Sequence, residues 1–558
     1  MRSSFGFGGL FLFLAGCSTP SCDFQLSCRN DYDCGIAQIC QSSFLLNACE
    51  DVLLCDGNPC PAGEECIQRE GAPPGNPFED ALPGKHVCQG PTVVGPGGTG
   101  GGGTGGSTGG STGGAPTCNT GVTEGEILGV QSAGTPAPES RPFLSAHSNG
   151  SVFYSYSFGT QSPDAGFVLS LRSPDGSAEW SQTVTADGAP SLLAQTSLGN
   201  GAAAAASFTG ALTLGDATLD SGSGSAVALF RIRTDGSLFS QQAIVSDDMV
   251  TVSALTRARF DNRVTIGGTF RGTLKIGDEI LVSSGGVDGF VAVLDLGTGK
   301  AVWTTRLGGA GDQEVTALAF DESTHETFAG GNFVGQIVLA ANPVTADATD
   351  AFVAKLDPES GALLEGRVIT GPDRQVVTAL ALPGKAALLV AGARTSESQS
   401  SGSIDFGDGL QLDAEGLVDG YLISVPSAHL ETVTWAALYG GPAGTGEVIP
   451  RALAIDCAGD AILVGSAGDG ATLDDGDPLP GAGGRDAFAL KLRPSPDLPS
   501  PKWAHVYGGP DDDEALAVLP RSSDSIWIAG TYRDSATFGD LVLTSKGADD
   551  LFLLQVTP

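Results

Sequence analysis

The chain contains few positively charged residues. Its 558 residues include 28 Lys and Arg against 64 Asp and Glu, and the formal net charge is −36 at pH 7. The negative charge is spread along the chain rather than gathered in one tail. A field of this sign repels nucleic acid and anionic lipid surfaces, which excludes both as direct ligands. Cations, and cationic or neutral surfaces, remain open as partners.

Histidine is also scarce. The five histidines share no position in the repeat described below and form no visible triad, so no catalytic pair is nominated. Gly-x-Ser-x-Gly matches occur, as at residues 105–109, but they lie in a Gly-rich tract. A hydrolase nucleophile or a dinucleotide site needs a strand before the motif and a helix after it, and neither is expected here.

The N-terminus lacks an apolar segment of membrane-spanning length. Residues 5–14 are apolar, but a stretch this short does not cross a bilayer as a mature helix. It ends at Leu14-Ala15-Gly16-Cys17, a pattern that predicts an export signal over residues 1–16.

This ending resembles the lipobox of bacterial lipoproteins. The resemblance implies cleavage before Cys17, with lipid on its sulfur and its new amino terminus, and several acyl chains on one residue anchor a protein stably in a bilayer. The residue after Cys17 is Ser18 and not Asp, which would favour retention in the inner membrane. The resemblance therefore favours the outer membrane, and it leaves open on which side of that membrane the protein lies. The alternative is an ordinary secretory signal with Cys17 in a disulfide.

Cysteines are concentrated before residue 119. After Cys17 they occur at Cys22, Cys28, Cys34, Cys40, Cys49, Cys55, Cys60, Cys66, Cys88 and Cys118. In an exported chain this even number indicates disulfides, holding a loop-rich module over residues 17–89 whose connectivity stays open. The spacings differ from the Cys-x-x-Cys of structural zinc sites, which disfavours metal. Two segments, 28–40 and 55–66, resemble small extracellular cysteine-rich repeats, EGF-like ones among them.

The remaining cysteine, Cys457, stands alone in the C-terminal part of the chain. No histidine lies near it in the sequence, so we expect an unpaired, partly buried thiol rather than a nucleophile. Residues 90–117, between the module and the rest, are Gly, Ser and Thr repeats. Such a linker is a flexible coil with a reach of roughly 30 Å.

A repeat of about 61 to 69 residues organises the rest of the chain. Each copy opens with an apolar strand that usually follows Asp, as in Asp288-Gly289-Phe290. The seven opening strands are centred on Phe167, Leu229, Phe290, Phe352, Tyr421, Phe488 and Leu551. In four copies a Trp follows, at Trp180, Trp303, Trp435 and Trp503. Because each ring removes much apolar surface from water, we expect these tryptophans to pack between neighbouring repeats.

Each copy contains short runs of Val, Ile, Leu, Phe and Ala separated by Gly, Asp and Pro, which is typical of about four antiparallel strands. A period of this length is typical of propeller blades. We therefore expect an all-β fold over residues 118–558, a seven-bladed β-propeller of four-stranded antiparallel blades. Gly-Asp pairs late in several copies, such as Gly277-Asp278, predict tight hairpin turns.

The two ends of the repeat array are incomplete. Residues 126–130, 142–146 and 151–158 look like three strands of a copy that lacks its first, and residues 549–556 look like a first strand alone. The prediction is a last blade closed by three N-terminal strands plus one C-terminal strand, which leaves no free sheet edge.

The sharpest acidic cluster consists of Asp511, Asp512, Asp513 and Glu514. Oxygen ligands suit calcium, which is therefore the one candidate cofactor. A solvated turn is the alternative, and it is favoured because no EF-hand or nonapeptide calcium pattern is present.

The run Asp-Gly-Phe-Val-Ala-Val-Leu-Asp at residues 288–295, then Trp303, Gly308-Gly309 and two further strands, resembles the seven-bladed β-propeller repeat of exported bacterial proteins, many of them myxobacterial. The resemblance covers residues 125–558 and is degraded over 202–249. It implies a surface or periplasmic scaffold, although a propeller fold alone does not determine function.

Two functions stay open. The first is a non-enzymatic binding or scaffold lipoprotein whose partners are the lipid bilayer, through acylated Cys17, and protein or glycan ligands of the envelope or extracellular space. The second is an exported carbohydrate-active enzyme, a lyase or glycosidase, with carboxylates, Arg or His gathered in the propeller channel.

Overall fold

The computed structural model divides the chain into two compact units, residues 1–109 and 110–558. In the second unit it describes residues 124–558 except 136, 148, 160–164, 187–188, 261, 340–341, 385, 397–400, 442–445, 474–477, 479–480, 496 and 522–524. Within the described residues no helix has the length and apolar character needed to cross a membrane.

In the first unit the structure describes three pairs of short antiparallel strands. They are β1 (Leu26–Ser27) with β2 (Asp33–Cys34), β3 (Gln38–Ser43) with β4 (Leu46–Asp51), and β5 (Glu65–Gln68) with β6 (His86–Gln89). The backbone register sets Cys40 opposite Cys49 and Cys66 opposite Cys88.

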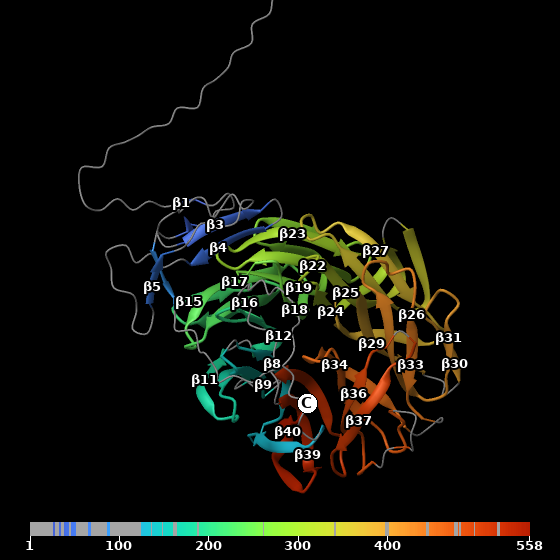
Figure 1. Ribbon diagram of the computed structural model, residues 1–558. Coiled ribbons are helices and arrows are strands. Elements are labelled where there is room, and N and C mark those ends of the chain that lie inside the picture. Colours follow the sequence, from blue (N-terminus) through green and yellow to red (C-terminus); the bar gives the residue numbers. More distant parts are fainter. Residues whose placement is uncertain are drawn as a thin grey trace, which may run out of the picture. The chain divides into compact units, whose positions relative to one another are not determined.

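The described part of the second unit contains seven groups of four antiparallel strands, which we call sheets 1 to 7 (Figure 1). Sheet 1 is β8 (Glu139–Ala146), β9 (Val152–Phe158), β10 (Gly166–Arg172) and β11 (Ala178–Thr185). Sheet 2 is β12 (Ser191–Leu198), β13 (Gly201–Phe208), β16 (Ser225–Arg233) and β17 (Leu238–Ser246). Sheet 3 is β18 (Met249–Arg257), β19 (Arg263–Arg271), β22 (Asp288–Asp295) and β23 (Lys300–Leu307). Sheet 4 is β24 (Gly311–Phe320), β25 (Thr327–Leu339), β26 (Asn342–Leu356) and β27 (Leu363–Ile369).

Sheet 5 is β28 (Arg374–Ala381), β29 (Ala387–Thr395), β32 (Val418–Pro426) and β33 (Trp435–Tyr439). Sheet 6 is β34 (Val448–Ile455), β35 (Ala461–Ala467), β36 (Asp486–Arg493) and β37 (Ser500–Tyr507). Sheet 7 is β38 (Glu514–Arg521), β39 (Ser525–Phe538), β40 (Leu541–Val556) and β7 (Ile127–Ala133). The expectation of an all-β fold built from four-stranded antiparallel sheets is confirmed.

Further pairings connect or extend these sheets. Strand β17 also pairs with β20 (Thr273–Ile276), which forms a hairpin with β21 (Glu279–Val282). Strand β26 meets β28 through one parallel pair, Thr349 opposite Arg374. Two more hairpins are β14 (Ala211–Leu214) with β15 (Ala217–Asp220), and β30 (Gly402–Asp405) with β31 (Gln411–Ala414). Gly277 and Gly539 turn such hairpins at φ values of 61° and 59°, so the predicted Gly-Asp turns are confirmed there.

The first strand of each sheet contacts the first strand of the next. The contacts run from β8 to β12, β18, β24, β28, β34 and β38, and β38 in turn contacts β8. In Figure 1 the strands follow this order in colour, and the C-terminus lies beside β40 in red.

The predicted division of the last sheet is wrong. Three strands of sheet 7 come from the C-terminal end and one, β7, from the N-terminal side, where β40 pairs with β7 from Leu551↔Ala133 to Val556↔Ile127. Residues 142–146 and 151–158, which were expected in the same sheet as the tail, lie in β8 and β9 of sheet 1. The tail therefore lies beside an N-terminal strand as expected, but with one such strand instead of three.

The error arises because a sequence repeat gives the spacing between equivalent strands but does not show which strand is the first in each sheet. The apolar strand taken as the opening one, such as β22, is the third strand of its sheet. The crossing to the next sheet falls at the Gly-Gly pair after Trp303. A Cβ at Gly308 would lie 2.7 Å from Asp288 Oδ2, and one at Gly309 would lie 1.9 Å from the Gln336 carbonyl oxygen. Only glycine allows the chain to cross so close to its neighbours.

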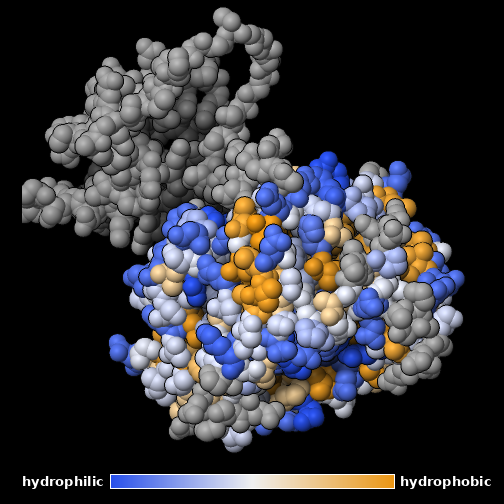
Figure 2. All heavy atoms as spheres, turned by 90° about the horizontal axis from the view of Figure 1, so that it is seen from below, coloured by the Kyte–Doolittle hydropathy of each residue, from blue (hydrophilic) through white to orange (hydrophobic). Residues whose placement is uncertain are grey.

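Apolar side chains of adjacent sheets form the core. Val291 and Trp303 of sheet 3 pack with Val315, Phe333 and Phe352 of sheet 4. The Trp303 indole N–H also donates to the Pro358 carbonyl oxygen of sheet 4 at 3.2 Å. The packing of this tryptophan between neighbouring repeats is therefore confirmed. On the face shown in Figure 2, hydrophilic and hydrophobic side chains are interspersed.

Candidate functional site

The acidic cluster proposed for calcium does not converge on one point. Asp512 accepts from the Arg485 backbone N–H at 2.9 Å and pairs with its guanidinium at 3.1 Å. Glu514 pairs with Arg451 at 2.5 Å. Asp513 is buried and accepts from the Gly509 and Arg533 backbone N–H groups. Within the described residues no group of three or more His, Cys, Asp or Glu side chains could hold a metal ion.

Asp513 instead belongs to a buried carboxylate pair between sheets 6 and 7. A Cβ at Gly508 would lie 2.0 Å from Asp486 Oδ1 and 2.8 Å from Asp513 Oδ2, so both carboxylates border the same glycine. Burial, with Asp486 nearby, raises the pKa of Asp513 to about 7. Burial also raises the pKa of Asp486. One Asp486 oxygen has no hydrogen-bond partner among the described residues.

A second carboxylate pair lies between sheets 7 and 1. Glu139 on β8 and Asp550 on β40 are both buried, at 1% and 0% exposure. Burial, with a contribution from the Asp550 charge, raises the pKa of Glu139 to about 7. The Asp550 carboxylate accepts from the Lys546 backbone N–H at 2.9 Å. Both pairs accept from backbone N–H groups at sheet boundaries, and Glu139, Asp486 and Asp550 each have one carboxylate oxygen without a hydrogen-bond partner among the described residues.

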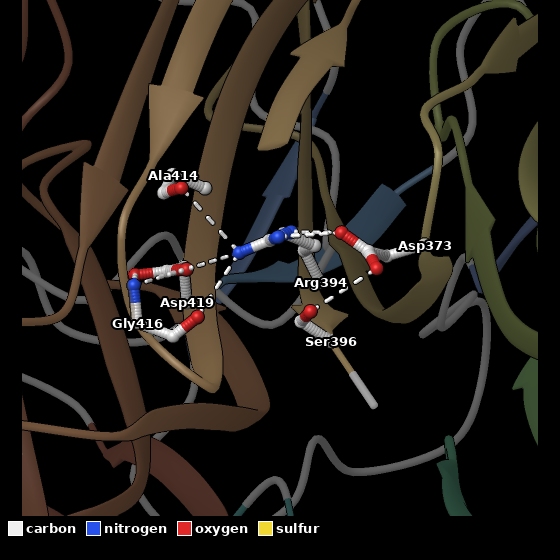
Figure 3. Close-up of polar contacts among 6 residues, drawn as sticks. All are labelled: Asp373, Arg394, Ser396, Ala414, Gly416 and Asp419. Carbon is white, nitrogen blue, oxygen red and sulfur yellow. Dashed lines mark hydrogen bonds and ion pairs between the residues drawn. The ribbon is translucent and has the colours of Figure 1, made fainter. Parts of the chain in front are cut away.

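Arg394 of β29 is the centre of a buried ion network in sheet 5 (Figure 3). Its guanidinium lies between Asp373, at 2.5 Å, and Asp419, at 3.1 Å, and it also donates to the Gly416 carbonyl oxygen at 3.0 Å. Burial raises the pKa of Asp419 although Arg394 opposes this. The charged and hydroxyl side chains in Figure 3 are all paired with protein groups, and the backbone of Ala414 and Gly416 takes part, so the network fixes the loop after β31 to its sheet.

The described histidines do not form a common site. His147 follows β8, His325 lies in the turn between β24 and β25, His429 lies between β32 and β33, and His505 is on β37. These four histidines belong to four different sheets of the second unit.

The prediction for Cys457 is wrong. Cys457 is disulfide-bonded and is not a free thiol. It lies in the turn between β34 and β35, where the Gly459 backbone N–H donates to the Asp456 carbonyl oxygen. A second cysteine far away in the sequence leaves no local pattern by which this bond could have been foreseen.

The other cysteines are not tested by the structure. Cys17, Cys22, Cys28, Cys55, Cys60 and Cys118 lie outside the described residues, and only the backbone is described for Cys34, Cys40, Cys49, Cys66 and Cys88. All eleven lie before residue 119, so the partner of Cys457 is one of them.

A hollow of about 180 Å³ lies between sheets 3 and 4, and we call it the Arg259 pocket. Its lining includes Arg259, Phe260, Arg263, Thr265, Val293, Trp303, Phe320, His325, Pro358 and Glu359. They come from the turn between β18 and β19, from the turn between β24 and β25, from the turn between β26 and β27, and from the adjacent strands. In the turn between β18 and β19, the Arg263 backbone N–H donates to the Phe260 carbonyl oxygen at 2.8 Å.

Two guanidinium groups face one ring in this pocket. The Arg259 and Arg263 Cζ atoms lie 5.4 Å and 4.7 Å from the centre of the Phe260 ring. His325, which also lines the pocket, adopts φ 62° and packs against Phe320, with ring centres 6.1 Å apart. Burial and the Arg259 charge lower the pKa of His325, which favours the uncharged form of its ring. The pocket thus combines fixed positive charge with aromatic surface.

The sequence carries one signal for this site. Residues 257–263 contain three arginines, whereas the whole chain has only 28 Lys and Arg in 558 residues. A dense basic segment inside a strongly acidic repeat protein marks a place where one repeat departs from the others.

No protein-family model and no curated protein sequence matches the chain. Among solved structures, Sqt1 from Chaetomium thermophilum aligns at 9% identity over 78% of this chain and 100% of that one, with a TM-score of 0.38. A protein of unknown function from Dyadobacter fermentans aligns at 8% identity over 77% and 100%, with a TM-score of 0.35. An N11 neuraminidase-like protein of A/flat-faced bat/Peru/033/2010 aligns at 9% identity over 78% and 96%, with a TM-score of 0.33. These TM-scores are too low to support an argument about function.

Proposed function

We propose that the chain is an exported lipoprotein, held in the outer membrane by acylated Cys17, that presents residues 118–558 as a closed seven-bladed β-propeller. In this proposal the propeller is a non-enzymatic binding or scaffold module. Its partners are the lipid bilayer, through Cys17, and a protein or glycan of the envelope or extracellular space.

The pairing of β40 with β7 and the contact of β38 with β8 support the closed ring. Such closure protects the edge of the last sheet, which would otherwise pair with other chains. The disulfide at Cys457 supports export, because disulfides form and persist mainly in oxidising compartments. The lipobox-like Leu14-Ala15-Gly16-Cys17 supports the anchor.

The observation that carries the binding role is the Arg259 pocket. Here the turn between two strands of a repeated sheet brings Arg259, Phe260 and Arg263 together over Trp303. Binding residues concentrate on loops that a rigid scaffold positions, and ligand sites combine apolar lining with a few convergent polar groups.

The anchor is tested by expressing the full chain with labelled palmitate and separating membranes from soluble fractions. The unaltered chain should incorporate label and sediment with outer membranes. The Cys17→Ser variant should neither incorporate label nor sediment with membranes. Cys22→Ser is the matched control, and it should incorporate label and sediment like the unaltered chain. Protease added to intact cells then shows whether the protein lies on the outer or the periplasmic side of the outer membrane. An unlabelled, soluble native chain would disprove the anchor.

A further inference from the structure

The Arg259 pocket contains polar groups that have no hydrogen-bond partner among the described residues. The Thr265 hydroxyl is 0% exposed, borders the pocket, and has no hydrogen-bond partner among the described residues. The Nε atom of Arg263 also makes no hydrogen bond within the described residues. Leaving a buried polar group unmatched costs about 1 to 3 kcal/mol, so a donor set of this kind indicates a missing partner.

Among the described residues, which leave out Asp261 of the same turn, neither guanidinium group makes an ion pair shorter than 3.7 Å. Arg259 Nη1 lies 3.9 Å from Glu359, and Arg263 Nε lies 3.7 Å from Asp295, both beyond hydrogen-bond distance. By contrast, Arg271 binds Asp248 at 2.6 Å, as a fully matched surface pair does. Arg259 and Arg263 therefore keep donors for an anion, and guanidinium forks match a carboxylate in shape.

The remaining walls are flat and apolar. Trp303 and Val293, each 6% exposed, line the pocket together with the Phe260 and Phe320 rings. A volume of about 180 Å³ is smaller than the roughly 300 to 1,000 Å³ typical of drug-sized ligands. The space suits one small group, such as a single sugar ring or a single aromatic acid.

We propose that the Arg259 pocket binds a small carboxylate whose carbon skeleton has a flat apolar face, with Arg259 and Arg263 binding the carboxylate oxygens and Thr265 meeting a further polar atom. This inference names a ligand class for the binding role proposed above and rests on it. The two guanidinium groups exclude a metal cation from the same space, because like charges repel.

The ligand class is tested with two probes on the full, lipid-anchored chain in detergent. Sodium phenylacetate represents an aromatic acid and sodium glucuronate an acidic sugar. Isothermal titration should show saturable binding of at least one probe. The probe that binds more tightly shows whether the natural ligand is an aromatic acid or an acidic sugar. The neutral analogues phenylacetamide and glucose should bind at least tenfold more weakly. If neither carboxylate saturates, or if the neutral analogue binds as well, the proposal is wrong.

Variants locate the binding. Arg259→Gln and Arg263→Gln should each weaken carboxylate binding at least tenfold. Arg257→Gln is the matched control, because Arg257 pairs with Glu322 and does not line the pocket. Glu359→Gln should tighten binding severalfold, because it removes the anion that competes for Arg259. A merely structural role would not produce tightening.

Folding of each variant is checked by its thermal midpoint. If Arg263→Gln does not fold, the binding measurements on Arg259→Gln and Glu359→Gln test the proposal instead. Both residues lie at exposed turn positions, so these variants should fold. Equal affinity in all variants would overturn the pocket assignment while leaving the membrane-anchor test of the proposed function unaffected.

Discussion

The Thr557 backbone N–H donates to the Glu126 carbonyl oxygen at 2.8 Å, which joins two residues at opposite ends of the described second unit. The Glu126 backbone N–H in return donates to Thr557 Oγ1 at 2.7 Å, and the Gly125 backbone N–H donates to the Thr557 carbonyl oxygen at 3.2 Å. These bonds replace the hairpin turn that joins the third and fourth strands elsewhere. The last sheet is thus completed without a covalent turn.

Thr557→Val should lower the free energy of unfolding by about 0.5 to 1.5 kcal/mol, the net worth of one hydrogen bond. Thr557 is only 5% exposed, and its replacement removes a buried acceptor from the Glu126 backbone N–H. The control is Thr213→Val, whose hydroxyl bonds the exposed Thr218 and should change little. Urea unfolding measures both, and equal effects would mean that the contact between the chain ends adds no stability.

Stability should rise as the pH falls from 8 to 5. The pKa of Glu139 and of Asp513 is about 7 in the folded protein and that of Asp350 is about 6, all above the ordinary values of the unfolded chain. The folded state therefore binds more protons than the unfolded state in this window, and protonation favours folding. Urea midpoints at pH 8, 6.5 and 5 measure the slope. A midpoint that falls between pH 8 and pH 5 would contradict this.

Asp513→Gln together with Glu139→Gln should flatten that pH dependence and stabilise the protein at pH 8. Gln313 already occupies the position of Asp513 in sheet 4, since the Gln313 and Asp513 backbone N–H groups donate to the Val287 and Arg485 carbonyl oxygens. A neutral amide there avoids the second charge beside Asp486. Exposed Asp247→Asn is the control, and an unchanged slope in the double variant would assign the pH dependence to the net charge instead.

Arg394→Met should lower the free energy of unfolding by about 3 to 5 kcal/mol, because it leaves Asp373 and Asp419 without their buried counter-ion. The matched control is Arg271→Met, which breaks an exposed pair with Asp248 and should cost less than about 1 kcal/mol. Chemical denaturation compares them. A cost for Arg394→Met no larger than that of the control would show that the network is dispensable.

The partner of Cys457 is expected to be Cys118. Lys502 Nζ lies 3.0 Å from Glu124 and 3.0 Å from Asp460, which is in the same turn as Cys457. The six residues from Glu124 back to Cys118 can reach at most about 20 Å, whereas Cys88 lies beyond the Gly-rich linker. Mass spectrometry of peptides from the unreduced protein identifies the bond, and a Cys457 peptide joined to any other cysteine would refute the expectation.

Cys118→Ser and Cys457→Ser should lower the thermal midpoint equally, and the double variant should lower it no further, because each change breaks the same bond. The loss reflects the removal of a long closed loop from the unfolded chain. A double variant that is clearly less stable than either single variant would show that the two cysteines act separately.

Much of the local structure could be predicted from the sequence. The apolar runs at Phe290 and Phe352 were predictable as strands because they are short, rich in β-branched and aromatic residues, and bounded by Gly and Asp. The Gly277-Asp278 turn was predictable because a tight hairpin needs positive φ. The packing of Trp303 between neighbouring sheets was predictable because tryptophans recur at the same position in four of the repeats.

The candidate site was not predictable in the same way. Arg259 and Arg263 are close in sequence, but Trp303, His325 and Glu359 approach them only when sheets 3 and 4 pack together. The composition of residues 511–514 suggests a cation site, yet the carboxylates bind Arg485, Arg451 and two backbone N–H groups. Composition does not show where neighbouring side chains point.

The sequence by itself determined that this chain is a series of short antiparallel strands with a constant period, because strand and turn preferences act over a few residues. Only the tertiary structure decided which strands share a sheet, that β7 alone completes sheet 7, and that Cys457 is bonded. These depend on contacts between residues hundreds of positions apart, where the close approach at Gly308 or Gly508 and the burial of opposing sheets select one pairing. No local preference carries that information.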